Sequence, residues 1–194
     1  MSKSKVQLIR IVFGAVLAAM VFVVTMFRFP LLGSKVHFAN AVCLLSGLLL
    51  GPVWGGFAAG LGSMLYDLFL YNEGIINLLI TFVSKFAMAW VCGKVMDASA
   101  KGRHRFDHTF LASVAGALTY VALYMLKTYV YNRFVYGFPL QTVGATVVSK
   151  LIPSLINAVA AIVAAPIFFH AVLPALRAGG VLKRIHAGEN AEKG

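Results

Sequence analysis

The chain has 194 residues, of which 60% are apolar and 12% charged, and its mean hydropathy is +0.86. One core of a soluble domain of this length could not hide that much apolar surface, so the composition excludes a soluble globular protein and predicts one integral membrane domain. The formal net charge of +11 comes without a basic, aromatic-rich soluble region, which excludes nucleic acid as a partner and favours the lipid bilayer.

Six membrane-spanning helices are predicted, and the second and third form a helical hairpin. The stretch from Val36 to Tyr66 contains 31 residues without an aspartate, glutamate, lysine or arginine. As one helix it would be about 46 Å long, too long for a hydrocarbon core of about 30 Å, and Gly51-Pro52 interrupts it. Residues 28–35 are expected to form a loop. The six spans are about 7–27, 36–50, 54–71, 75–95, 109–131 and 141–173.

These spans form a single membrane domain, 1–176, followed by a basic tail, 177–194. The first segment is expected to stay as a span, because no signal-peptidase site follows Phe27. The leader, the 94–108 loop and the tail hold 11 of the 17 lysines and arginines, whereas the opposite loops hold three. The positive-inside rule therefore places both termini in the cytoplasm of a multi-pass protein, which we expect in a bacterial plasma membrane.

Apart from Arg10 and Lys94 at cytoplasmic span ends, the predicted spans contain four charged residues, Asp67, Lys85, Lys127 and Lys150. An ionisable group in a span costs at least about 2.5 kcal/mol on insertion scales, so it usually faces a protein interior or a wet cavity. Each lies on a polar stripe with a spacing of three or four residues, which is one face of a helix. The stripes predict one outward-opening cavity. Its expected ligand-binding residues are His37, Asn40, Asp67, Asn77, Thr81, Lys85, Tyr124, Lys127, Thr146 and Lys150.

A structural explanation of the same residues also exists. Lysines near helix ends can reach the headgroups, and Asp67 could pair with one of them. Lys85 and Lys150 are too deep for this to be easy, so they carry most of the prediction.

Motifs for catalysis and nucleotide binding are absent from the sequence. There is no G-x-x-x-x-G-K-[ST] loop, H-E-x-x-H or G-x-S-x-G, so the chain cannot use ATP by itself and is not expected to be an enzyme. Cys43 and Cys92 fall inside spans and are expected to be inert thiols. No metal and no cofactor are expected.

Several segments resemble the substrate-binding S components of energy-coupling factor (ECF) vitamin transporters, nearest the riboflavin-type branch. They are FRFPLLGSK, VHFANA, LLLGPVWGG, Asp67 and ITFVSKF. The resemblance implies a six-helix bundle that holds a vitamin near its outer face. It also implies docking on a transmembrane coupling protein with two cytoplasmic ATPases, with Ala15 and Ala19 matching the alanine motif for that contact. The lid that it implies consists of Phe29, Pro30, Leu31, Leu32, Gly33 and Lys35.

The balance of charged residues in the predicted cavity indicates the charge of the ligand. Three lysines against Asp67 favour a small carboxylated or phosphorylated vitamin, since buried cations need an anion. A neutral ring, such as a pyrimidine or a flavin, stays open, because a buried lysine can lose its proton; Tyr120, Tyr124 and Trp90 could supply ring faces. The alternative function is a six-span structural scaffold of the bacterial wall or cell-shape machinery, which would need no ligand.

Overall fold

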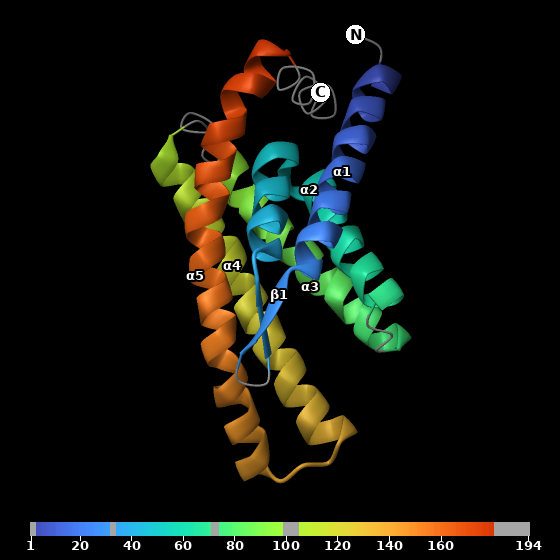
Figure 1. Ribbon diagram of the computed structural model, residues 1–194, viewed down its shortest axis with the longest axis vertical. Helices are drawn as coiled ribbons and strands as arrows, with labels where there is room; N and C mark the ends of the chain where they lie inside the picture. The colour runs from blue at the N-terminus through green and yellow to red at the C-terminus, as the bar shows by residue number, and fades with distance from the viewer. Residues whose placement is uncertain (1–2, 32–33, 71–73, 99–104, 181–194) are drawn as a thin grey trace.

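The computed structural model describes residues 3–31, 34–70, 74–98 and 105–180 and shows a helical bundle with one short β-ribbon (Figure 1). Five helices in these residues are long and apolar enough to cross a membrane, so the all-helical membrane fold is confirmed in outline. In chain order the elements are α1 (Lys3–Met26), β1 (Arg28–Leu31), β2 (Ser34–His37), α2 (Ala39–Leu70), α3 (Ile75–Ala98), α4 (Phe106–Val130), the π-helical turn η2 (Tyr131–Val135) and α5 (Leu140–Ala178).

Helix α2 is folded back on itself at Gly51. Gly51 has a φ of 75°, a backbone conformation that glycine adopts without a steric cost. The Ser46 hydroxyl donates a hydrogen bond to the Gly55 carbonyl at 2.9 Å, and Cys43 Sγ lies 3.9 Å from Ser63 Oγ. Twenty residues of straight helix would separate that last pair by about 30 Å. The predicted helical hairpin is therefore present within α2, as two antiparallel arms.

The first arm of α2 is the central helix of the bundle. Every residue from Ala39 to Leu50 is buried, as expected for a helix that is apolar all round. Glycines let the neighbouring helices approach closely. A Cβ on Gly47 would lie 2.4 Å from the Ala89 carbonyl oxygen of α3, and one on Gly62 would lie 2.3 Å from the Ala18 carbonyl oxygen of α1. Small residues thus set the spacing between α1, α2 and α3.

Replacing Gly47 by alanine is expected to destabilise the fold. The added methyl cannot fit unless α2 and α3 separate, and overpacking of this kind costs about 1–3 kcal/mol. The measurement is equilibrium unfolding in detergent micelles. The matched control is Gly144→Ala, because Gly144 is helical and has nothing within 4 Å of an added Cβ; it should be neutral or more stable. Equal stability of Gly47→Ala and the wild type would contradict the packing described above.

The segment before α2 differs from the prediction, because it forms strands. We expected a loop at 28–35 and a helix from residue 36. Instead β1 and β2 pair antiparallel, with Arg28 opposite His37 and Leu31 opposite Ser34, and α2 begins at Ala39. The backbone N–H of His37 donates to Asn157 Oδ1 of α5 at 2.9 Å. This contact between residues 120 positions apart fixes the end of β2. No local pattern in the sequence predicts such a contact.

Other helix ends move outward from their predicted positions. Helix α1 begins at Lys3 and α3 continues to Ala98. Helix α5 continues to Ala178, two residues into the predicted tail that starts at residue 177. The rest of the predicted tail, 181–194, lies outside the described residues.

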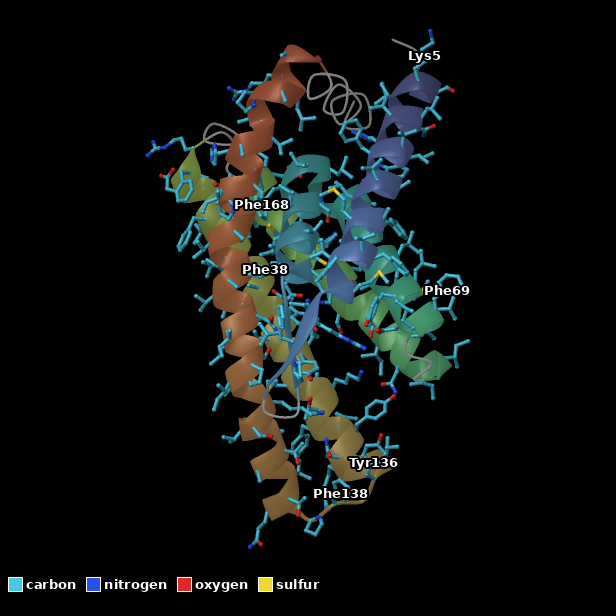
Figure 2. All side chains as sticks on the ribbon, viewed as in Figure 1. Lys5, Phe38, Phe69, Tyr136, Phe138 and Phe168 are labelled. Atoms are coloured by element: carbon cyan, nitrogen blue, oxygen red, sulfur yellow. The ribbon has the colours of Figure 1, made fainter. Side chains whose placement is uncertain are left out.

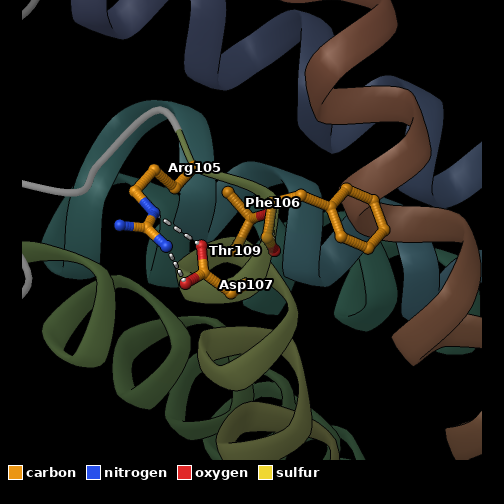
Figure 3. Close-up of polar contacts among 4 residues, drawn as sticks. All are labelled: Arg105, Phe106, Asp107 and Thr109. Atoms are coloured by element: carbon orange, nitrogen blue, oxygen red, sulfur yellow. Dashed lines mark hydrogen bonds and ion pairs between the residues drawn. The ribbon is translucent and has the colours of Figure 1, made fainter.

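The start of α4 carries a polar pair at the surface (Figure 3). Arg105 donates to both carboxylate oxygens of Asp107, at 3.2 and 3.0 Å, while the Thr109 hydroxyl donates to the Phe106 carbonyl at 2.8 Å. Asp107 in the first helical turn also complements the helix dipole. Both partners of the ion pair are more than half exposed, so the pair adds little stability. It marks this end of the bundle as polar.

The outside of the bundle is apolar. Figure 2 shows Phe69 and Phe168 directed away from the helices that carry them, and the two side chains are 71% and 45% exposed. Such side chains are expected where lipid, rather than water, is the solvent.

Candidate functional site

A cavity of about 560 Å³ lies where the ribbon meets the five helices. Its volume falls within the range of small-molecule sites, about 300–1,000 Å³. The residues that line it are Thr25, Arg28, His37, Ser63, Tyr66, Asp67, Asn77, Thr81, Lys85, Tyr120, Tyr124, Lys127, Thr128, Tyr131, Asn132, Tyr136, Lys150, Ser154 and Asn157. All of them carry polar side-chain groups, and they come from every helix and both strands.

Most of the predicted site residues meet in this cavity. The polar stripes on α2, α3, α4 and α5 turn toward one another, because each follows the helical repeat on one face. The residues brought together as expected are His37, Asp67, Asn77, Thr81, Lys85, Tyr124, Lys127 and Lys150. Their role in binding stays a prediction.

Lys85 is held by contacts within the protein. The side chain is 5% exposed, its ammonium group donates a hydrogen bond to Asn40 Oδ1, and its Nζ lies 3.7 Å from the centre of the Tyr120 ring. The ring face and the amide oxygen stabilise the buried positive charge. Asn40 was predicted to contact the ligand, but it does not line the cavity. Its place is behind Lys85, which it positions.

Helix α5 contributes polar side chains to the cavity, among them Lys150 and Ser154. In the part of the chain that the structure describes, Lys150 Nζ has no hydrogen-bond or ion-pair partner, and the buried Ser154 Oγ has none either. The two residues are one turn apart on the same face. Thr146 precedes Lys150 by one turn and was also predicted as a site residue, but it does not line the cavity. Its hydroxyl donates a hydrogen bond to the Thr142 carbonyl at 2.8 Å.

The turn after α4 contributes Asn132 and Tyr136, which the sequence did not single out, beside Tyr131, the last residue of the polar stripe predicted for the span 109–131. In η2 the Tyr136 N–H bonds to the Tyr131 carbonyl at 3.0 Å, five residues back, and this wider turn keeps Tyr131, Asn132 and Tyr136 at the cavity wall. Asn132 Nδ2 donates to the Thr128 carbonyl at 2.7 Å, and the side-chain carbonyl is an acceptor. Asn132 continues a four-residue polar spacing from Thr128, but it lies one residue beyond the predicted span 109–131.

The ribbon contributes two residues to the cavity wall. Arg28 and His37, which pair across the two strands, line the cavity, and the Arg28 guanidinium lies 5.4 Å from the centre of the Tyr66 ring. Of the predicted lid residues, Phe29 and Pro30 are exposed and do not line the cavity. Leu32, Gly33 and the side chains of Leu31 and Lys35 lie outside the described residues.

Positive charge dominates the cavity wall. Arg28, Lys85, Lys127 and Lys150 face Asp67, a formal balance of four cations to one anion among the described lining residues. Tyrosine rings lie beside several of the cations, and Lys127 Nζ is 5.7 Å from the centre of the Tyr131 ring. Such a wall can bind an anionic group and stack an aromatic ring.

Comparison with known proteins agrees with the resemblance noted in the sequence. The profile of the family "ECF-type riboflavin transporter, S component" matches residues 5–173. The chain belongs to this family of S components. The family is one of membrane transport components, and the five long apolar helices of this chain agree with a membrane protein. The structural scaffold that the sequence left as an alternative is therefore not favoured.

The S component is also similar to a curated archaeal protein. It is 28% identical over 106 residues to "Uncharacterized protein in gap 3'region" of Pyrococcus woesei. The similar region covers 53% of this chain and 66% of that protein, and the name of the relative gives no activity.

Proposed function

We propose that this S component is the substrate-specific subunit of an ECF-type importer and binds a vitamin or related micronutrient in the 560 Å³ cavity. It would deliver the ligand inward together with a transmembrane coupling protein and two cytoplasmic ATPases. The observation that carries the proposal is the convergence of polar stripes from otherwise apolar helices on one cavity. Polar and ionisable groups are retained inside a membrane where a ligand or ion uses them.

The proposed topology has six crossings: α1, the two arms of α2, α3, α4 and α5. Helix α1 begins and α5 ends at the same end of the bundle (Figure 1), as an even number of crossings requires. The excess of lysine and arginine at that end supports a cytoplasmic location for both termini. The cavity would then open on the outer side of a bacterial plasma membrane.

The proposed ligand is anionic. The four cations of the cavity wall, with Lys150 uncommitted, support a carboxylate or phosphate group, and the tyrosines support a ring. The family name supplies a matched pair of probes, riboflavin and riboflavin 5′-phosphate, which share a ring system and differ in charge. We expect the phosphate to bind about 10- to 100-fold more tightly, because one charge-assisted hydrogen bond contributes about 1.5–3 kcal/mol. Calorimetry that gives equal affinities, or a preference for riboflavin, would favour the neutral-ligand alternative.

The isolated chain is expected to bind the vitamin without accumulating it, because its sequence carries no nucleotide-binding loop. Vesicles that contain this polypeptide alone should show saturable binding and no ATP-driven uptake. Vesicles that also contain the coupling protein and the ATPases should accumulate the same compound. Accumulation by the polypeptide alone would disprove the proposed division of labour.

The proposed contact with the coupling protein is the face of α1 that carries Ala15 and Ala19. Both residues are exposed, whereas Leu17 and Ala18 of the same helix are buried. Small side chains on an exposed face allow another helix to approach closely. The alanine motif of the family supports the same assignment.

A further inference from the structure

The end of the α4–α5 helix pair is apolar at a place where a membrane protein usually becomes polar. We call this end the outer tip; it consists of Arg133, Phe134, Val135, Tyr136, Phe138 and Leu140. Phe134 is 74% exposed and Leu140 is 61% exposed. In Figure 1 the tip projects beyond the ribbon and beyond the ends of the other helices. Without a covering medium it would expose a contiguous apolar surface to water, which is unfavourable.

Helix α5 is longer than a bilayer is thick. Helix α5 has 39 residues and is about 58 Å long, whereas a bilayer with its headgroups is about 40–45 Å thick. An upright α5 would place one of its ends in water. The far end of α5 carries Arg177 and suits water, but the outer tip does not. A tilted bundle would keep the tip at the membrane surface and leave the Arg177 end outside.

The chemistry of the outer tip matches the bilayer interface. Tyr131, Tyr136 and Phe138 form a chain of ring contacts, with centroids 6.3 and 5.8 Å apart. The Arg133 guanidinium uses Nη1 for the Phe138 carbonyl at 3.2 Å, and its fork has five N–H donors. Aromatic rings beside an arginine are typical of the headgroup level, where rings sit at the acyl boundary and the guanidinium meets phosphate.

We propose that the outer tip is a lipid anchor, which inserts its aromatic and aliphatic side chains into the outer leaflet while Arg133 binds phospholipid phosphate. Because Tyr136 of the tip and the neighbouring Tyr131, whose ring it contacts, also line the cavity, the anchor holds the cavity mouth at the lipid–water boundary. The inference rests on the proposed membrane topology. It does not depend on which vitamin binds, or on whether one does.

The test is the accessibility of a nitroxide label to lipid-soluble oxygen and to a water-soluble nickel complex, with the full chain in phosphatidylcholine vesicles. The label is placed at Phe138→Cys. The native thiols need no removal, because Cys43 and Cys92 are buried. The references are Val163→Cys, on the exposed apolar side of α5, and Arg105→Cys, at the polar start of α4.

Lipid insertion predicts that the label at residue 138 favours oxygen over the nickel complex, as at residue 163, and differs clearly from residue 105. Accessibility equal to that at residue 105 would place the tip in water and overturn the proposal. Protection from both reagents would indicate a protein partner, such as a second copy, and would also overturn it. If Phe138→Cys does not fold, Leu140→Cys gives the same readout from the same tip. Vitamin binding does not enter this readout, so its failure leaves the proposed function untouched.

Discussion

Uptake is expected to stop when Ala15 and Ala19 are both replaced by tryptophan, while vitamin binding to the isolated S component stays unchanged. The two residues lie one turn apart on the exposed face of α1, outside the cavity. Indole side chains there would hold the coupling protein away from the helix backbone. Uptake should fall to the background level in vesicles that contain the complete transporter, and calorimetry on the variant alone should give the wild-type affinity.

A matched pair of bulky substitutions controls for general damage. Leu118 and Ala122 are also one turn apart and exposed, on α4. Tryptophan at both of these positions should leave uptake intact, because lipid accommodates a larger apolar side chain. Full uptake by the Ala15→Trp, Ala19→Trp variant would show that α1 is not the contact surface.

Lys150→Met is expected to weaken binding of riboflavin 5′-phosphate about 10- to 100-fold without changing the stability of the fold. The ammonium group has no hydrogen-bond or ion-pair partner among the described residues, so its removal costs the ligand a charge-assisted hydrogen bond worth about 1.5–3 kcal/mol and costs the protein nothing comparable. Calorimetry and thermal unfolding on the same samples separate the two effects. Lys94→Met is the control, since Lys94 is exposed on α3 and does not line the cavity.

Lys85 should behave differently, because it also supports the structure. Lys85→Met leaves Asn40 Oδ1, which is buried, without its donor, at a cost of about 1–3 kcal/mol. The double variant with Asn40→Leu should recover part of that stability, because both polar partners are then gone, but it should not recover binding. Unchanged affinity in both Lys150→Met and Lys85→Met would contradict an anion site at these lysines.

The polar stripes made much of the candidate site predictable. A lysine inside an apolar helix is rare enough that Lys85 and Lys150 pointed inward from the sequence alone, and the three- and four-residue spacing gave the faces. The fold-back at Gly51 was predictable for the same kind of reason, because glycine followed by proline breaks a stretch that is too long for one crossing.

What escaped prediction depends on contacts between distant parts of the chain. Strand β2 ends at His37, whose backbone N–H donates a hydrogen bond to Asn157 of α5. The residues of V-H-F-A-N-A were predicted to begin a helix, so the strand was not expected. Asn40 was predicted on the same helical face as the cavity residues, but its side-chain oxygen accepts a hydrogen bond from Lys85 instead of lining the cavity. The helical repeat predicts which face of a helix a residue lies on, but it does not predict which side chain of another helix will contact that residue.

Native mass spectrometry of the purified chain tests the central claim most directly, namely that this S component holds a vitamin in its cavity. The chain is purified without its partners and offered an equimolar mixture of vitamins, with riboflavin and riboflavin 5′-phosphate among them. We predict one bound molecule per chain, anionic in character, that is absent from the Lys85→Met, Lys150→Met double variant and present in Lys94→Met. A chain that retains no vitamin, or a double variant that retains the same molecule equally well, would contradict the claim.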